Sequence, residues 1–177
     1  MKYTLIILTL ILTFSCKAQR TEFKVSCYET REKSLEYPKE VGTITKTCKF
    51  ENYIFKSTGK PNYKGQYSYE YELSLIDKVD TLKINNAEFF NENVKELEKM
   101  INDKLRTEYE ANLKISEIKE CMKWIDFRYY DINEFGISFN HKKQMNFYID
   151  YDIGSACANV GGSIITLNYY ELKKYLK

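Results

Sequence analysis

The sequence predicts an α+β protein in which an antiparallel sheet packs one face against a long amphipathic helix and a short C-terminal helix. Three observations support this prediction. Residues 66–77 alternate strictly between apolar and polar side chains, which is typical of a half-buried strand. Residues 91–110 repeat apolar side chains at spacings of three and four, which is typical of a helix. Alternation then returns from residue 127.

The first residues have the pattern of an export signal. Lys2 stands before an almost uninterrupted apolar run at residues 4–14. A helix of this length would rise about 16 Å, roughly half the apolar thickness of a bilayer, so it is too short to span one. A basic start followed by a short apolar segment is typical of export signals instead. We therefore expect the protein to work outside the cytoplasm.

Residues 12–16 resemble the lipobox of bacterial lipoproteins, in which a cysteine is acylated and becomes the first residue after cleavage. Cys16 is then the lipidation site, with palmitate among its acyl chains, and residues 1–15 are the signal peptide. Residues 16–21 form a tether to the membrane. The alternative is ordinary cleavage after Gln19, which leaves no lipid.

Four further cysteines remain once Cys16 is assigned to lipid, and four cysteines can pair in three ways. Cys27 and Cys48 each share an apolar face of an alternating segment, so they are expected to face inward as cross-strand neighbours. We therefore favour Cys27 with Cys48 and Cys121 with Cys157, as in an oxidising compartment. Four buried free thiols are the alternative, because unpaired cysteine is often buried.

The central elements follow from local signals. Residues 31–40 are polar and are expected to form a loop between the first two strands. Residues 77–78 predict a turn from the strand at 66–77 into a hairpin partner. Asn93 and Glu96 resemble a capping box at the start of the helix.

After residue 112 the periodicity is less regular. Residues 113–124 partly continue the helical pattern. Alternation predicts a hairpin of residues 127–132 with 136–141, then a strand from Met145, a glycine-rich loop and a last strand from Ser163. The chain closes on a short helix that Asn168 and Glu171 are placed to cap.

Composition limits the possible partners. The mature chain from Cys16 has 162 of the 177 residues, which suits one domain at residues 22–177. Removal of the signal removes one of the 27 basic residues and none of the 25 acidic residues. A balance of 26 to 25 excludes binding to nucleic acid by electrostatic attraction, because that mode needs a basic excess.

The C-terminal half resembles the RsiV-like extracytoplasmic domain family, which includes a lysozyme-sensing anti-sigma factor. The resemblance covers roughly the last ninety residues and implies an α+β module that binds a partner in the cell envelope, with no catalytic residue carried over. The similar motifs are at residues 88–90, 136–139, 151–154, 161–162 and 170–176.

Few residues suggest chemistry. Asp150 and Asp152 flank Tyr151 and are expected on the same side of a strand, either as an acid and base pair, as oxygen ligands for Ca²⁺, or as the solvated side of the strand. We take these three residues as a weak binding candidate. His141 is the one histidine and is expected in a solvated turn, and the glycines at residues 159–163 lack a phosphate-binding pattern. No metal site, cofactor or catalytic residue is predicted.

Sixteen tyrosines suggest a recognition surface for a glycan or a protein, because tyrosine offers a stiff and amphipathic contact area. Tyr67, Tyr69 and Tyr71 fall on one face of the strand at 66–77. The same three residues also suit a core, and a bias toward AT-rich codons is another source of tyrosine. Both readings stay open at this point.

The sequence therefore favours a lipid-anchored cell-envelope protein that binds a protein or glycan partner without catalysis. The membrane is reached through the N-terminal lipid, at the periplasmic face or the cell surface. By analogy with the family, the partner is a muralytic enzyme such as lysozyme. One alternative is a small polysaccharide hydrolase that uses paired carboxylates, and another is a membrane-anchored immunity-type inhibitor.

Overall fold

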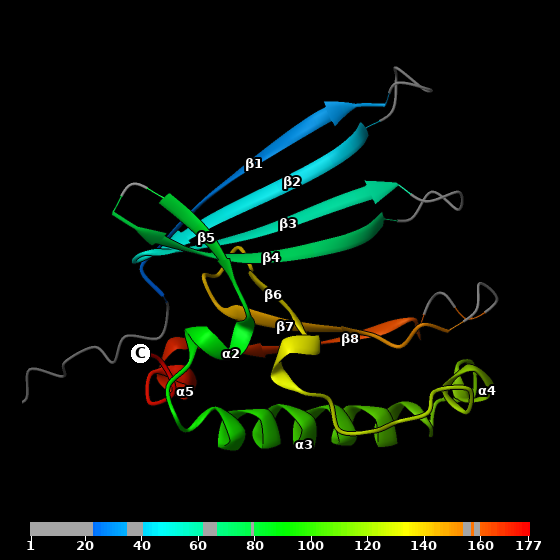
Figure 1. Ribbon diagram of the computed structural model, residues 1–177. Coiled ribbons are helices and arrows are strands. Elements are labelled where there is room, and N and C mark those ends of the chain that lie inside the picture. The colour runs from blue at the N-terminus through cyan, green and yellow to red at the C-terminus, as the bar shows by residue number, and fades with distance from the viewer. Residues whose placement is uncertain (1–22, 35–40, 62–66, 79, 154–156, 158–159) are drawn as a thin grey trace, which may run out of the picture.

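The computed structural model describes residues 23–34, 41–61, 67–78, 80–153, 157 and 160–177 (Figure 1). The predicted signal peptide, the tether and Cys16 lie outside these ranges. The larger sheet contains β1 (Val25–Lys33), β2 (Val41–Phe50), β3 (Tyr53–Pro61), β4 (Tyr67–Asp77) and β5 (Asp80–Ile84) in that order. The smaller sheet contains β6 (Gly136–Phe139), β7 (Met145–Asp150) and β8 (Gly162–Leu167). The helices are α2 (Asn86–Phe89), α3 (Val94–Asn112), α4 (Lys119–Met122), the 3-10 turn η1 (Ile132–Glu134) and α5 (Tyr169–Leu172).

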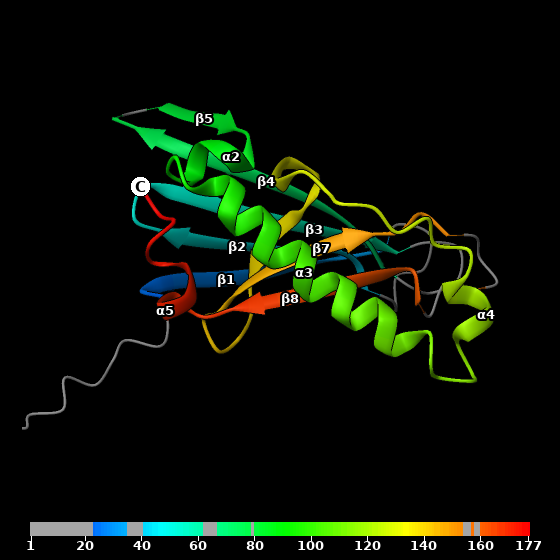
Figure 2. The ribbon, with the colours of Figure 1, turned by 90° about the horizontal axis from the view of Figure 1, so that it is seen from below.

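The α+β class and the antiparallel pairing agree with the sequence prediction, but the strands form two sheets instead of one. The smaller sheet lies between the larger sheet and α3 (Figure 1), and α3 runs across β7 and β8 (Figure 2). Leu97, Ile101 and Leu105 of α3 are fully buried, as is Leu167 of β8. Among the described residues, no helix is long and apolar enough to cross a membrane.

Aromatic side chains fill the core where the two sheets converge. Phe23 contacts Phe50 and Phe139 edge to face, with ring centroids 5.2 and 5.1 Å apart. Phe89 of α2 contacts Phe55 in the same geometry at 5.1 Å. These side chains are 1–2 % exposed, so they supply much of the apolar burial that holds the larger sheet to the rest of the molecule.

Two disulfides join Cys27 to Cys48 and Cys121 to Cys157, the pairs that the sequence favoured. Cys27 and Cys48 are directly opposite each other on β1 and β2. Both cysteines lie on the inward face of the sheet as expected, but only Cys48 is buried, at 2 % exposed, whereas Cys27 is exposed because β1 is the edge strand. The second disulfide ties α4 to the segment after β7.

The hairpin predicted for residues 127–132 with 136–141 is wrong. Residues 127–131 form no strand, and Ile132–Glu134 is a 3-10 turn. The reason is that Tyr130 satisfies its backbone groups with the side chain of Asn102 on α3, at 2.8 and 2.9 Å, so they are not available to a neighbouring strand. This segment therefore binds to the helix and leaves β6 to pair with β7 alone.

Of the two capping boxes predicted at helix starts, one forms and the other does not. At α5, Asn168 and Glu171 form the expected capping box, with reciprocal contacts of 3.1 and 2.9 Å. The capping box predicted at Asn93 and Glu96 is wrong, because Asn93 makes no side-chain cap. Instead, the side chain of Asn91 accepts a hydrogen bond from the backbone N–H of Asn93 at 2.9 Å.

Candidate binding cleft

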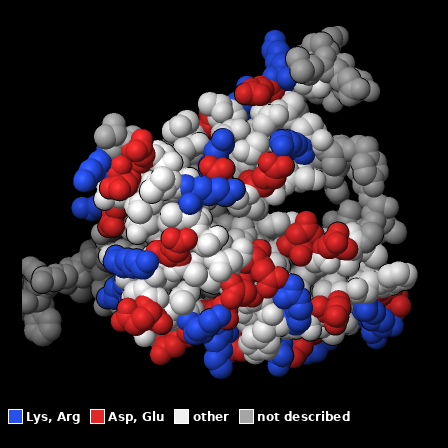
Figure 3. All heavy atoms as spheres, in the orientation of Figure 1, with Lys and Arg blue, Asp and Glu red and all other residues white. Residues whose placement is uncertain are grey.

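The two sheets converge at the end of the molecule that carries α2 and α5 and diverge toward the opposite end (Figure 1). The space-filling view shows a hollow between the sheets on the diverging side (Figure 3). We call this hollow the inter-sheet cleft. Its walls are the inner face of β3 and β4 and the face of β7 and β8 that points away from α3.

One face of the larger sheet runs from the core into the cleft. Residues directly opposite on neighbouring strands share a face, and so does every second residue along a strand. Phe55 and Leu73 form a buried row at the core end. The next rows on this face pair Ser57 with Tyr71 and Gly59 with Tyr69. The apolar core row thus gives way to rows of small residues and tyrosines.

The tyrosines form a continuous line of rings. Tyr67 and Tyr69 have ring centroids 6.3 Å apart, as do Tyr69 and Tyr71. Tyr71 then contacts Tyr148 of β7 with centroids 5.7 Å apart. Planes of successive rings are tilted by 31–38°. Tyr69 is 45 % exposed, so this line is not simply part of the core.

Glycines give the tyrosine rings room to lie against the backbone. A Cβ atom at Gly59 would come within 2.7 Å of Cε1 of Tyr69, which is closer than real contacts allow, and within 3.2 Å of Cδ1 of Tyr67, which is a tight contact. The Tyr69 ring therefore extends over β3 above Gly59. Similarly, a Cβ atom at Gly136 would come within 2.6 Å of Cγ of Tyr71, so Tyr71 packs directly on β6.

The opposite wall belongs to the smaller sheet. Tyr148 pairs in register with Ile164 of β8, on the face opposite to buried Phe147 and Ile165. Tyr148 also lies across β8, because a Cβ atom at Gly162 would come within 2.9 Å of its hydroxyl. Ile164 is 54 % exposed, which is unusual for isoleucine in a strand. Both walls of the cleft thus present accessible apolar surface.

Polar groups surround this apolar surface. Lys46, on the same row as Ser57, donates a hydrogen bond to the backbone carbonyl of Phe139, and Arg31 pairs with Glu29 at 2.8 Å.

Burial raises the pKa of Tyr71 well above its ordinary value. Burial, with a smaller effect of the Asp150 charge, also raises the pKa of Tyr148. Both phenols therefore stay neutral at physiological pH.

The residues singled out in the sequence lie at the rim of this region. Asp150 ends β7 and is exposed, and its carboxylate accepts a hydrogen bond from the backbone N–H of Asp152 at 2.9 Å. Asp152 lies beyond the strand with φ 49°, so the two carboxylates do not share one side of a strand as expected. Tyr151 is half-buried and donates from its hydroxyl to Ser163 at 2.9 Å.

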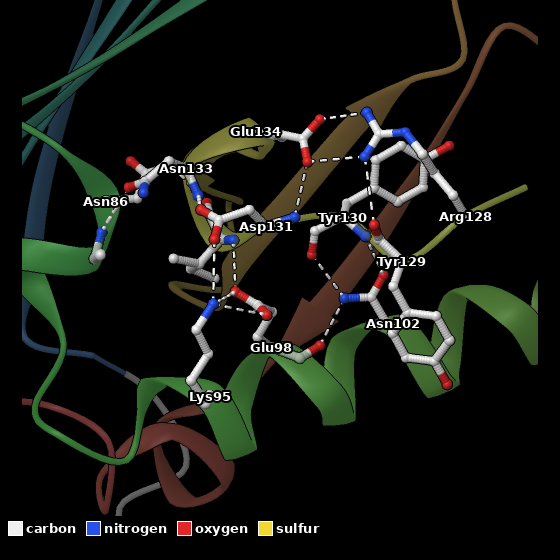
Figure 4. Close-up of polar contacts among 12 residues, drawn as sticks. Asn86, Lys95, Glu98, Asn102, Arg128, Tyr129, Tyr130, Asp131, Asn133 and Glu134 are labelled. Atoms are coloured by element: carbon white, nitrogen blue, oxygen red, sulfur yellow. Dashed lines mark hydrogen bonds and ion pairs between the residues drawn. The ribbon is translucent and has the colours of Figure 1, made fainter.

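A second group of carboxylates lies between α3 and η1 (Figure 4). Glu98 binds Lys95 at 3.0 Å and accepts a hydrogen bond from the backbone N–H of Ile132 at 3.0 Å. Asp131 accepts from the backbone N–H of Asn133 at 3.0 Å, and Glu134 pairs with Arg128. Each carboxylate binds a cation or a backbone N–H, so the arrangement fastens the turn to the helix and offers no free acid and base pair.

The same group of contacts positions Gly136 under Tyr71. The amide of Asn86 on α2 donates to the backbone carbonyls of Ile132 and Phe135 at 3.0 and 2.6 Å. The side chain of Asn133 in turn accepts from the backbone N–H of Ala87 at 3.0 Å. These contacts fix η1, and with it the start of β6, against the end of the larger sheet.

The remaining candidates stay apart from the cleft. His141 is exposed in the turn between β6 and β7, as expected. In the described part of the chain, no three His, Cys, Asp or Glu side chains are grouped so that they could hold a metal ion. A separate surface groove of about 520 Å³ runs along the outer side of α3 and is lined by Met100, Thr107 and Tyr175 with charged neighbours.

Sequence reasoning identified the tyrosines of β4 but not their partner Tyr148. Tyr148 falls on the polar side of its alternating strand, so its position gave no reason to separate it from solvated residues. A signal for it was the pair Gly136 and Gly162, which are the first residues of the two strands that pair with β7 and leave room for large rings.

The fold and the cleft together define an α+β protein of two antiparallel sheets with a tyrosine-lined opening between them. Comparison of the chain with protein-family models, with curated proteins and with solved structures finds no match in any of the three. Function is therefore inferred from the inter-sheet cleft and from the N-terminal pattern.

Proposed function

We propose that this protein is a lipid-anchored binding module of the cell envelope and that the inter-sheet cleft holds its partner. The observation that carries the proposal is the line of rings from Tyr67 to Tyr148, because it joins accessible aromatic surfaces of two different sheets. Tyrosine is a preferred contact residue at binding sites. In this proposal α3 and α5 cover one side of a single domain, and the cleft lies on the other side.

The direction of the cleft suits an anchored protein. The described chain begins at Phe23, at the end of the molecule that also carries α5 (Figures 1 and 2). The inter-sheet cleft lies toward the opposite end, where the two sheets diverge (Figures 1 and 3). A tether at residues 16–21 would extend at most about 20 Å, so it would hold the converging end near the membrane. The cleft would then lie on the side of the domain away from the lipid surface, where it could meet soluble or surface-bound partners.

The resemblance to RsiV-like domains supports a partner in the envelope, with a muralytic enzyme such as lysozyme as the protein candidate by analogy alone. An immunity-type inhibitor would use the same anchor and would differ in capturing a toxin. The polysaccharide hydrolase has less support, because the Asp150 and Asp152 carboxylates do not lie on one side of a strand.

Affinity capture from envelope extract tests the binding role. The full chain is immobilised alongside two variants, Tyr69→Ala in the cleft and Tyr28→Ala on the outer side of β1. Tyr28 is 64 % exposed and serves as the matched control for loss of a surface tyrosine. We expect the wild type and Tyr28→Ala to retain the same envelope component and Tyr69→Ala to lose it. Equal retention by all three proteins would refute the cleft as the binding site.

The anchor is tested separately. Cys16→Ala should abolish labelling by a fatty-acid probe and move the protein to the soluble fraction, because an acyl chain supplies the membrane affinity. A Cys27→Ala and Cys48→Ala double variant removes the disulfide between these two residues and should keep the label. Unchanged membrane association of Cys16→Ala would show that the lipid prediction is wrong.

A further inference from the structure

We propose that the occupant of the inter-sheet cleft is an oligosaccharide chain without net negative charge, bound by stacking of its sugar rings on Tyr69, Tyr71 and Tyr148. This inference rests on the proposed binding function and specifies its ligand class. Three features of the cleft lead to it: the placement of the aromatic rings, the balance of charge, and the position of the tyrosines on a sheet face.

The aromatic rings are placed as a stacking surface. Tyr69 lies over Gly59, so one side of the ring meets backbone while the residue remains 45 % exposed. The axial C–H groups of a pyranose ring carry partial positive charge and are attracted to the negative face of an aromatic ring. Ring centroids 6.3, 6.3 and 5.7 Å apart give a repeat comparable to that of successive sugars in an extended chain.

Charge is balanced among the described residues that line the cleft. On the rows through Ser57 and Gly59 the charged residues are Glu29, Arg31 and Lys46, and Asp150 ends β7 on the opposite wall. Two acids and two bases sum to zero. Arg31 is already paired with Glu29, and Lys46 with a backbone carbonyl. The described residues of these rows therefore offer no unpaired cation to a phosphate or uronate chain, while the exposed carboxylate of Asp150, which also accepts from the backbone N–H of Asp152, can accept from a hydroxyl or an amino group.

The tyrosine rings project from the face of the larger sheet into the cleft. Along Tyr69 and Tyr71, β4 pairs with β3 on one flank only, because β5 pairs with Leu73–Asp77, so β4 is the sheet edge here. An extended peptide that added a strand at this edge would lie beside the sheet, in its plane. A ligand that recognises ring surfaces and hydroxyl groups would instead lie on the rings themselves, so it fits this wall of the cleft.

Titration calorimetry of the full chain tests the inference, in a detergent that carries no sugar. The probes are soluble oligosaccharides of N-acetylglucosamine and of glucose, which are neutral, of glucosamine, which is cationic, and of galacturonic acid, which is anionic. We expect at least one neutral or cationic probe to bind and the anionic probe to bind at least tenfold more weakly. Tyr69→Ala and Tyr148→Ala should each weaken binding about tenfold, whereas Tyr69→Phe and Tyr28→Ala should not.

Failure of all four probes to bind the wild type would overturn the inference. An affinity that stays the same in Tyr69→Ala and in Tyr148→Ala would overturn it as well. Tyr69→Phe guards against a folding artefact, because it keeps the ring in place. The capture experiment separates the two proposals. An envelope protein retained by the wild type and lost in Tyr69→Ala, with no sugar bound, would reject the glycan and keep the binding module.

Discussion

Tyr71 of the larger sheet and Tyr148 of the smaller sheet meet with ring centroids 5.7 Å apart. Their contact closes the inner end of the inter-sheet cleft. Tyr71 also packs on Gly136 of β6, so the same ring contacts two strands of the smaller sheet. The cleft is therefore part of the packing between the sheets, and its shape depends on a few positions where large rings meet backbone.

The first prediction concerns Gly136. Gly136→Ala would place a methyl group within 2.6 Å of Cγ of Tyr71, near the root of the side chain, so the ring cannot simply rotate away. We expect the free energy of unfolding to fall by about 1–3 kcal/mol because the buried site is overpacked. Urea unfolding followed by circular dichroism measures this. A loss no larger than that of Gly59→Ala, where only the far end of a ring must move, would contradict the packing described.

The second prediction concerns Gly59 itself. Gly59→Ala should displace the Tyr69 ring, since its Cβ atom would meet Cε1 at 2.7 Å, while the strand keeps its pairing. We expect stability to change by less than about 1 kcal/mol and capture of the envelope component to weaken. Capture on immobilised Gly59→Ala, compared with Tyr28→Ala, checks this. Wild-type capture by Gly59→Ala would show that the position of the Tyr69 ring does not matter.

The third prediction concerns Asn102. Its side chain is fully buried and makes three hydrogen bonds, two to the backbone of Tyr130 and one to the carbonyl of Glu98. Asn102→Ala would leave the buried backbone groups of Tyr130 without partners, and we expect a loss of about 3 kcal/mol. Thermal unfolding measures it. Lys99→Ala, which breaks an exposed ion pair with Asp103, is the control and should cost less than about 1 kcal/mol.

The fourth prediction concerns acid stability. The hydrogen bond from Arg128 holds the pKa of Glu134 below its usual value. A carboxyl with a lowered folded-state pKa stabilises the fold above its unfolded pKa of about 4.3 and loses that contribution as the pH falls through the folded value. Stability should therefore decline on acidification below about pH 4.3, and the decline should be shallower in Glu134→Gln.

Because Glu134 and Arg128 are both partly exposed, we expect this difference to stay below about 1 kcal/mol. Urea unfolding at several pH values between about 3 and 6 follows it. Glu110→Gln, which removes an exposed carboxylate on α3, is the control for the loss of one surface charge. A Glu134→Gln profile identical to that of the wild type would mean that the ion pair is not formed in solution.

Much of the fold could be predicted from periodicity. The strict alternation at residues 66–77 corresponds to β4, and the turn after Asp77 leads into β5, where Lys78 adopts the left-handed conformation with φ 52°. The division into two sheets could not be predicted. The segment before β6 is held to α3 by the side chain of Asn102, which binds the backbone of Tyr130, and no local pattern marks a contact between residues 28 positions apart.

The sequence also gave no prediction of β3. Its inward side changes from Tyr53 and Phe55 to Ser57 and Gly59, so the apolar alternation fades halfway along the strand. The structure explains this change, because the second half of β3 leaves the core and lines the cleft. The small inward residues Ser57 and Gly59 thus weaken the apolar alternation of the strand and also make room for the tyrosine rings.

Site-specific photo-crosslinking in living cells tests the central claim most directly. A benzophenone amino acid inserts into nearby C–H bonds of a protein or a glycan, so it reports occupancy whichever class the partner has. It would replace Tyr69 in the cleft, Tyr28 on the outer side of β1 or Met100 in the groove along α3. We predict a crosslinked product from position 69 and none from positions 28 and 100. Products from position 28 or 100, with none from position 69, would contradict the account.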